Sequence, residues 1–291
     1  MPRIIWSIWP TTGFIAVSIA ILSAVFLGGF SCFQKCAVNA PIVTEWELTF
    51  SDEFDGEGQP DPEKWISQEY NRKPNSNGPD GWWSKDQVRL DGRGHLEILV
   101  SVVENQNDDQ DNDPKDYATG MVSTEGIFEQ KFGRFEARLK GPRQTGWWGA
   151  FWLFSDAVEQ IDGSGRDGTE IDIIELFGGL RSPQHALHWD GYGRAHQVKG
   201  KKLWFLSDTD EWHTYALEWT PEAYVFFVDG KETWRSRAGG VSQSAVWLKF
   251  TGEIATDKNT QEYWSGKIND LNYPDRFLID WVRVYQQKSE N

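Results

Sequence analysis

Short segments of alternating or β-branched and aromatic residues, separated by Gly, Pro, Asn and Asp, recur along the chain from Glu45 onward. Clear examples lie at residues 95–103, 133–140, 224–228 and 277–285. Such segments predict strands, and no stretch shows sustained helical periodicity with caps. Asp229-Gly230 after the third segment indicates a hairpin turn, because Gly tolerates the positive φ of a tight primed turn. About 250 residues of this pattern without a second linker predict one all-β sandwich of two large antiparallel sheets.

The chain is acidic and unusually rich in aromatic residues. Its 291 residues include 29 Lys and Arg against 44 Asp and Glu, which gives a net charge of −15. No basic run of the kind that holds a phosphate backbone occurs, so nucleic acid is not an expected partner. The 17 Trp, 17 Phe and 8 Tyr exceed what packing one core requires. Because the C–H faces of sugars stack on flat apolar rings, sugars are candidate ligands.

The first forty residues have the composition of a targeting segment. Arg3 and Lys35 flank an apolar run from about residue 13 to 30, and no acidic residue is present. The run falls short of the roughly 20 residues that span a bilayer, and residues 38–40 match a small-residue cleavage site. We expect a secretory signal peptide, with an uncleaved signal anchor or a lipid on Cys32 as alternatives.

This reading sets the domain boundaries and the compartment. We expect residues 1–40 to be a signal peptide or signal anchor and residues 41–291 to form one domain, secreted or attached to the cell envelope. Contact with a membrane is expected only through an uncleaved leader. Both cysteines, Cys32 and Cys36, lie in the leader, which excludes disulfides and thiol catalysis from the mature domain.

The strongest chemical signal lies at residues 169–178, where three carboxylates are interleaved with apolar residues. On a strand, Glu170 and Asp172 share one face about 7 Å apart. Glu175 would then point into the core, where an ionised carboxylate without a partner is very costly. A β-bulge between Asp172 and Glu175 would return Glu175 to the face of the other two. We therefore expect a bulged strand with three carboxylates on one face.

Carboxylates crowded on one face can separate a proton-bearing acid from an ionised nucleophile, as glycoside hydrolysis requires. An exposed strand with an acidic outer stripe is the alternative reading of this segment taken alone. Upstream, residues 146–154 contain Trp147, Trp148 and Trp152. These are too many rings for one core strand to bury on a single face, so at least one should face a groove.

Further motifs occur in order along the mature chain. They are Phe50-Ser51-Asp52-Glu53-Phe54-Asp55-Gly56 with Trp65, Gly133-Arg134-Phe135-Glu136-Ala137-Arg138, Trp148-Gly149-Ala150-Phe151-Trp152-Leu153, Trp212 to Pro221, Val228-Asp229-Gly230 and Ile279 to Tyr285. Together with residues 170–175, they resemble glycoside hydrolase family 16, a group of concanavalin-like β-jelly-rolls. Laminarinases, lichenases, agarases, carrageenases and plant xyloglucan-modifying enzymes belong to it. The E-x-D-x-x-E spacing is similar to the branch with laminarinases and agarases.

The resemblance implies roles for individual residues. Glu170 matches the family nucleophile, Glu175 the general acid/base, and Asp172 the residue that orients and electrostatically tunes the pair. Trp148 and Trp152 match aromatic residues of the groove that stack on sugars.

Other implied roles concern the substrate groove and a metal ion. His188 matches a histidine across the cleft from the carboxylates, with a structural histidine as the alternative. Glu136 and Arg138 match a strand that lines the donor subsites, although pairing of Arg with neighbouring acids would also explain them. Asp280 matches the carboxylate of a structural Ca²⁺ site, to which Gly94 could add a backbone carbonyl.

The sequence also departs from the family pattern. Gly149 replaces the usual Pro, residues 83–88 replace an Asn-Asn-Glu motif, and residues 247–252 differ from the usual Asn-containing penultimate strand. These changes fall near the groove and concern the identity of the polysaccharide more than the reaction.

The residues and the resemblance together predict a retaining endo-β-glycosidase that acts on β-linked glucan, chiefly at β-1,3 linkages. An agar-type galactan hydrolase and a transglycosylase with the same three residues are the alternatives. A non-catalytic, lectin-like glucan-binding protein is the alternative from another class. We expect a polysaccharide as the partner, no cofactor for catalysis, a possible structural Ca²⁺ and a monomer.

Overall fold

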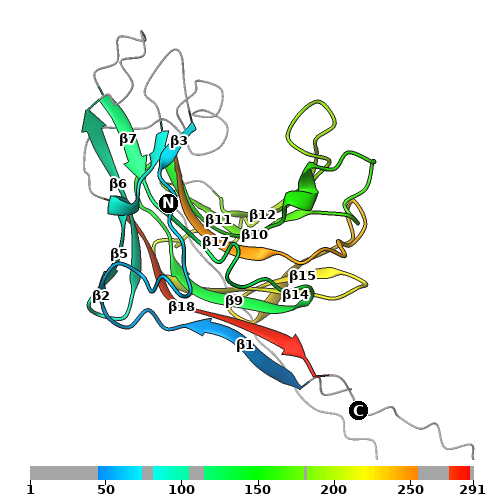
Figure 1. Ribbon diagram of the computed structural model, residues 1–291. Helices are drawn as coiled ribbons and strands as arrows, with labels where there is room; N and C mark the ends of the chain where they lie inside the picture. The colour runs from blue at the N-terminus through cyan, green and yellow to red at the C-terminus, as the bar shows by residue number, and fades with distance from the viewer. Residues whose placement is uncertain (1–44, 74–80, 105–114, 180–181, 255–274, 289–291) are drawn as a thin grey trace, which may run out of the picture. The chain divides into compact units, whose positions relative to one another are not determined.

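The computed structural model describes residues 45–73, 81–104, 115–179, 182–254 and 275–288. In these residues the chain forms two β-sheets and two short 3-10 helices, η1 (Lys85–Gln87) and η2 (Asp156–Glu159) (Figure 1). No helix within these ranges has the length and apolar character needed to cross a membrane. The expected signal segment, with Cys32 and Cys36, lies outside the described residues.

One sheet has twelve strands and contains both ends of the described chain. Nine strands follow one another in the order β16-β15-β14-β9-β18-β6-β7-β4-β3, while β1 pairs with β18, and β5 pairs with β6 and β2. The strands are β1 (Trp46–Asp52), β2 (Glu57–Gly58), β3 (Tyr70–Lys73), β4 (Gly81–Trp83), β5 (Val88–Asp91), β6 (Leu96–Glu104), β7 (Lys115–Thr119), β9 (Gly133–Lys140), β14 (Trp212–Trp219), β15 (Tyr224–Val228), β16 (Lys231–Ser236) and β18 (Asp275–Gln287). All pairs in it are antiparallel except β4 with β7, which is parallel.

The second sheet has six antiparallel strands in the order β13-β12-β11-β10-β17-β8. They are β8 (Met121–Ser123), β10 (Trp147–Phe154), β11 (Glu170–Phe177), β12 (Gln184–Trp189), β13 (Gln197–Lys202) and β17 (Trp247–Ile254). Figure 1 shows this sheet lying across β9, β14, β15 and β18. The all-β jelly-roll sandwich expected from the sequence is therefore confirmed.

The predicted strands fall where alternation placed them. The segment 133–140 is β9 and 224–228 is β15, while 277–285 lies inside the longer β18. The hairpin between β15 and β16 turns at Asp229 and Gly230, which both have positive φ, 48° and 73°. This is the primed-turn geometry that the Asp-Gly pair predicted.

The core lies between the two sheets and is lined by the inward face of each strand. Its fully buried side chains include Phe135, Leu139, Phe226, Phe277 and Ile279 from the larger sheet and Phe151, Ile171, Ile174, Leu187 and Phe250 from the smaller one. Gly149 belongs to this contact, because a Cβ placed there would lie 2.5 Å from Cγ of Phe277. The glycine thus lets the Phe277 ring pack directly against β10.

Candidate active site

Strand β11 places three carboxylates on the outer face of the six-stranded sheet. Its register with β12 pairs Glu170 with His188, Asp172 with Ala186 and Glu175 with Gln184, with a shift between Asp172 and Glu175. Within that shift, Ile173 and Ile174 are both completely buried. The two adjacent isoleucines face the core, and Glu175 returns to the side of Glu170 and Asp172. The predicted β-bulge is confirmed. It keeps the Glu175 carboxylate out of the core, which is the reason for which the bulge was predicted.

Polar neighbours hold each of these carboxylates in place. The Tyr192 hydroxyl donates a hydrogen bond to Oε2 of Glu170. Gln184 donates from Nε2 to Oε2 of Glu175 over 2.7 Å. Nε2 of His188 lies 3.2 Å from Oδ2 of Asp172. Each acidic group therefore has its own fixed partner.

A second histidine, His196, lies beside His188. Nδ1 of His188 lies 2.9 Å from Nε2 of His196, and the two rings are stacked. Burial lowers the pKa of His188, but the hydrogen bond and charge of Asp172, with the charges of Glu170 and Glu175, raise it to about 9. Burial and the charge of His188 lower the pKa of His196. At neutral pH a protonated His188 thus donates to Asp172 and to a neutral His196.

The two glutamates share the site but differ in their surroundings. Burial and the charge of Asp172 raise the pKa of Glu175 to about 8, against the hydrogen bond from Gln184. The same two causes raise the pKa of Glu170, to about 7, against His188, Tyr192 and Arg72. Glu170 is the carboxylate with more partners for its charge, because His188, Tyr192 and Arg72 all favour its ionised form.

Donor atoms of Glu170, Asp172 and His188 all lie within 4.8 Å of one another, close enough to hold a metal ion. A metal would need the His188 nitrogen without its proton, whereas the raised pKa of His188 keeps that proton in place at neutral pH. The arrangement fits proton chemistry better than metal binding.

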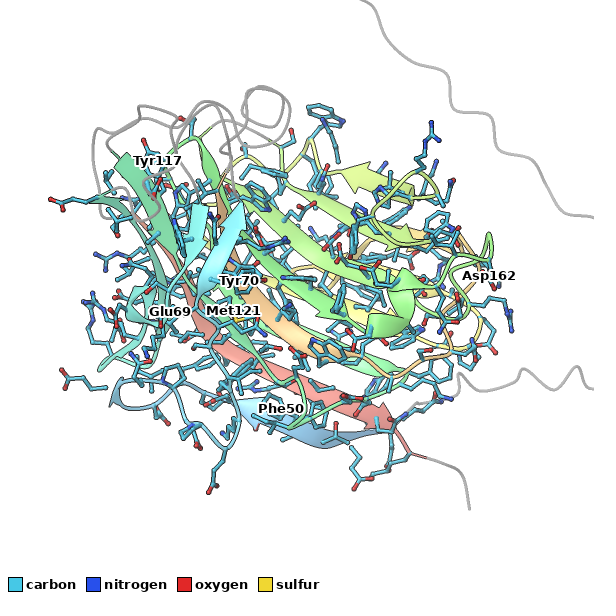
Figure 2. All side chains as sticks on the ribbon, turned by 45° about the horizontal axis from the view of Figure 1, so that its top comes forward. Phe50, Glu69, Tyr70, Tyr117, Met121 and Asp162 are labelled. Carbon is cyan, nitrogen blue, oxygen red and sulfur yellow. The ribbon has the colours of Figure 1, made fainter. Side chains whose placement is uncertain are left out.

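Trp148 and Trp152 both lie on β10, on the same face as the carboxylates. Trp148 is half-buried, pairs with Phe177 in the register of β10 and β11, and packs against its ring. Trp152 is only 7% exposed, and its Nε1 donates to Oγ1 of Thr251 over 3.1 Å. Trp147 points into the core instead. Trp148 is thus the more accessible of the two predicted stacking rings. Figure 2 shows the side chains that stand on the two sheets.

Glu136 and Arg138 do not lie near these carboxylates. On β9 they alternate with buried Phe135, Ala137 and Leu139, so they stand on the outer face of the twelve-stranded sheet. Glu136 accepts a hydrogen bond from Arg134 over 2.7 Å, and Arg138 pairs with Asp280 and covers the ring of Trp212. Their expected place beside the donor subsites is therefore corrected. Alternation revealed that they face solvent, but not which sheet they belong to.

The surroundings of Asp280 do not fit a calcium ion in the described arrangement. Its Oδ2 accepts a 2.5 Å hydrogen bond from Nη1 of Arg138, and its Oδ1 lies 4.0 Å from Nε2 of His95. A cation at this carboxylate would have to share it with the guanidinium group of Arg138. Gly94 lies in the turn before β6 with φ of 87°. This left-handed conformation by itself explains why a glycine stands at this position, without a metal.

Several side chains of the site were not singled out in the sequence. Tyr192, Gln184 and His196 contact Glu170, Glu175 and His188 respectively. Arg72 and Lys249 act on Glu170 through charge. For Lys249 a signal existed, because the segment 247–252 departs from the family pattern and places a lysine between apolar residues. Tyr192 is flanked by two glycines in a loop, where no periodicity marks it.

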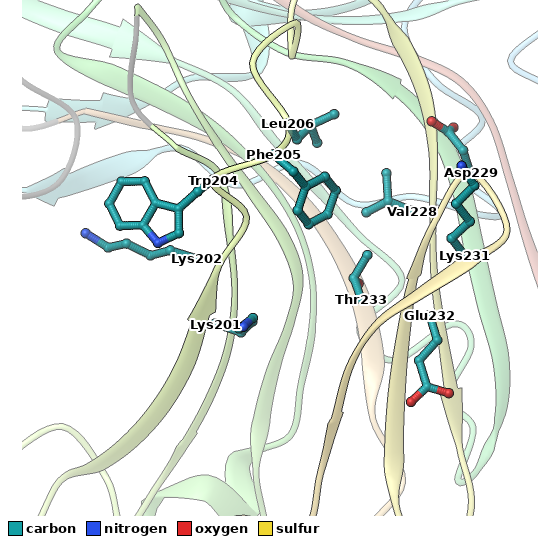
Figure 3. Close-up of a pocket in the computed structure, with 10 residues that line it drawn as sticks. All are labelled: Lys201, Lys202, Trp204, Phe205, Leu206, Val228, Asp229, Lys231, Glu232 and Thr233. Atoms are coloured by element: carbon teal, nitrogen blue, oxygen red, sulfur yellow. The ribbon is translucent and has the colours of Figure 1, made fainter. Parts of the chain in front are cut away.

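A separate hollow lies away from the carboxylates, between the edge strand β13 and the hairpin of β15 and β16 (Figure 3). Trp204 and Phe205 lie beside it and are 75% and 66% exposed. The catalytic set does not border it.

Comparison with known proteins agrees with this geometry. A family model described as "Glycosyl hydrolases family 16" matches residues 79–283. The beta-glucanase of Rhodothermus marinus is 27% identical over 281 residues, which cover 92% of this chain and 93% of that protein. The keratan-sulfate endo-1,4-beta-galactosidase of Sphingobacterium multivorum is 25% identical, over 86% of this chain and 58% of that protein.

The fold is also found among solved structures. The X-ray structure of the laminarinase from Rhodothermus marinus superposes with a TM-score of 0.67 at 23% identity, over 85% of this chain and all of that one. The family match covers well over half of the chain, including all three carboxylates of β11. The chain therefore belongs to the glycosyl hydrolases of family 16.

Proposed function

We propose that the protein is a retaining, endo-acting β-glycosidase that hydrolyses β-1,3-linked glucan. The observation that carries this proposal is the bulged strand β11, which puts Glu170, Asp172 and Glu175 on one face. Burial and the charge of Asp172 raise the pKa of Glu170 to about 7 and that of Glu175 to about 8. Two carboxyl groups in different protonation states are what double displacement at a sugar requires.

The first chemical step uses both glutamates. The ionised Glu170 attacks the anomeric carbon, and the bond from that carbon to the glycosidic oxygen breaks. The proton of Glu175 passes to the departing oxygen, which leaves as a free hydroxyl. Tyr192, which donates to Glu170, orients the nucleophile for this attack.

The second step returns the enzyme to its starting state. Glu175, now ionised, accepts a proton from water, and the water oxygen attacks the anomeric carbon and releases Glu170. Asp172 is held by His188 beside both glutamates. Its negative charge favours the protonated form of Glu175 at the start of each cycle.

The names of relatives support glucan as the substrate. They include the beta-glucanase of Rhodothermus marinus and a glucan endo-1,3-beta-glucosidase of Niallia circulans, 25% identical over 85% of this chain. We also propose that the apolar leader exports the domain to the outside of the cell or its envelope. Amino-terminal sequencing of the protein recovered from culture medium tests this point, with a new terminus near residue 41 as the expected result.

The function is tested by measuring new reducing ends on laminarin, mixed-linkage glucan, agarose and carrageenan. Laminarin should be cut fastest, with oligosaccharides of several lengths among the early products. Glu170→Gln and Glu175→Gln should each lose nearly all activity. Glu136→Gln, a matched change on the outer face of the other sheet, should keep it. Binding without new reducing ends would support the lectin-like alternative, and faster release from agarose would support the galactan alternative.

Two further readouts refine the result. Longer products in the presence of an added oligosaccharide acceptor would show transglycosylation. Azide should restore turnover in Glu175→Ala as a β-glycosyl azide and in Glu170→Ala as an α-glycosyl azide, because azide takes the place of water in one case and of the nucleophile in the other.

A further inference from the structure

Lys249 is a buried cation on the catalytic face of the six-stranded sheet. It lies on β17, directly opposite Trp152 in the register with β10. Because Trp152 in turn pairs with Asp172, Lys249 is two strands from Asp172, about 10 Å across the sheet. Only 8% of Lys249 is exposed.

Three aromatic rings surround its ammonium group. Nζ lies 4.5 Å from the ring centroid of Trp152, 5.3 Å from that of Phe154 and 5.5 Å from that of Trp83. The rings are themselves anchored, since Nε1 of Trp83 donates to the carbonyl oxygen of Gly252 over 2.9 Å. Trp152 is anchored in the same way to Thr251. The ammonium is thus held in a fixed position.

The cage of rings supplies no acceptor for the three N–H donors of Lys249. Among the described residues, its ammonium makes no hydrogen bond or ion pair, only these ring contacts. Burial lowers its pKa, partly offset by the charge of Glu253, with smaller contributions from Arg72, Glu125 and Glu170. Cation–π contacts with the three rings offset only part of the cost of burying a charge that has no hydrogen-bond acceptor. Stability alone therefore does not account for this lysine.

A second cation shares the Trp83 ring. The guanidinium carbon of Arg72 lies 5.0 Å from the ring centroid of Trp83. Nε of Arg72 is 3.5 Å from Oε1 of Glu253, which compensates part of its charge. The charge of Glu170 also acts on both Arg72 and Lys249. Arg72 thus has a carboxylate beside it, whereas the ammonium of Lys249 contacts only aromatic rings among the described residues.

We propose that Lys249 and Arg72 form a subsite for an anionic substituent, a carboxylate or a sulfate ester, on a sugar unit next to the one that Glu170 attacks. This inference rests on the proposed function, because it places the substrate on the face that holds Glu170. An oxygen anion supplies the acceptors that the ammonium lacks. Charge-assisted hydrogen bonds are roughly twice as strong as neutral ones. The enzyme then acts on glucan chains that carry acidic groups, despite the negative charge of the whole domain.

The test compares hydrolysis of neutral laminarin with that of lightly carboxymethylated and lightly sulfated laminarin. The measured quantity is the ratio of kcat/KM on each anionic glucan to kcat/KM on the neutral one. Lys249→Met removes the charge and keeps an unbranched side chain of similar length. It should lower the ratio about tenfold or more for at least one anionic glucan, chiefly through KM, as expected for a lost charge-assisted bond.

Two variants control the comparison. Lys231→Met removes one exposed lysine from β16 and should leave the ratio unchanged. Lys249→Arg keeps the positive charge and should keep most of the preference. Whichever anionic glucan gives the unmodified enzyme the larger kcat/KM ratio identifies the substituent, as a carboxylate for carboxymethylated laminarin or a sulfate ester for sulfated laminarin.

The outcomes separate this inference from the proposed function. If the unmodified enzyme cuts none of the three glucans, the proposed glucanase function fails. If it cuts neutral laminarin and Lys249→Met changes all three substrates alike, the anionic subsite is wrong and the function stands. If Lys249→Met does not fold, the test uses the unmodified enzyme, whose kcat/KM ratio is measured at increasing NaCl concentration. Its ratio should fall as NaCl rises, and a ratio independent of salt would overturn the subsite.

Discussion

Nε2 of His188 lies 3.2 Å from Oδ2 of Asp172, and this contact joins β12 to β11, the strand that carries the three carboxylates. The raised pKa of His188 keeps it protonated, so Asp172 faces a cation on one side and the two glutamates on the other. The negative charge of Asp172 raises the pKa of Glu175 and so favours its protonated form.

The hydrogen bond from Gln184 to Glu175 should set the alkaline limit of activity. This bond lowers the pKa of Glu175, opposing burial. Gln184→Met removes the donor, so the pKa of Glu175 should rise and the acid should keep its proton to higher pH. The alkaline limb of kcat/KM should move upward by about half a pH unit or more, a change of about 0.7 kcal/mol. A limb that stays in place or moves downward would contradict the role of Glu175 as the acid.

Ionisation of Glu175 should lower the free energy of unfolding at alkaline pH. Its folded-state pKa of about 8 lies above its ordinary value of 4.5, so its favourable contribution is complete below that ordinary value and is lost as pH rises through about 8. Glu175→Gln removes this loss. Its unfolding free energy should match that of the unmodified protein near pH 4 and exceed it by at least about 1 kcal/mol at pH 9. Urea unfolding at both pH values provides the measurement, and a variant less stable at pH 9 would refute the pKa direction.

Trp148 should bind sugars without supporting the core. Trp148→Ala should raise KM on long oligosaccharides several-fold, since it deletes a stacking surface of about 1 kcal/mol, while the domain stays folded. Trp147→Ala is the matched change one position away, where the ring is completely buried and Nε1 donates to Asp275. That variant should lose about 3 to 5 kcal/mol of stability. Unchanged kinetics on polymer for folded Trp148→Ala would remove it from the groove.

Calcium should have little effect at Asp280. The carboxylate already accepts a hydrogen bond from Arg138, so added Ca²⁺ or a chelator should leave the melting temperature unchanged. Thermal unfolding with calcium and with excess chelator measures this directly. A rise in melting temperature with calcium that disappears in Asp280→Asn would show that Asp280 binds the ion, as the family resemblance implied.

The sequence predicted those parts of the fold that depend on neighbouring residues. Strand alternation placed β9 and β15, and the cost of a buried Glu175 predicted the bulge of β11 before any pairing was known. Both arguments depend on which face a side chain occupies within one strand. Such information is local, and residues two or three positions apart carry it.

The features that the sequence predicted wrongly or did not predict depend on contacts between distant segments. Glu136 faces away from the carboxylates because β9 pairs with β14 and β18 in the larger sheet, a fact that alternation does not contain. Trp83 and Lys249 meet although 166 positions separate them in the chain. Only the assembled sheets bring these residues together.

The most direct test of the account is the anomeric configuration of the first-formed product. Glu170 as nucleophile and Glu175 as acid and base require two inversions at the anomeric carbon, so the β configuration is retained. Proton NMR of the unmodified enzyme with laminarin, recorded before mutarotation, should show the β-anomeric signal appearing first. If the α-anomeric signal appears first, the mechanism is inverting and Glu170 is not the nucleophile.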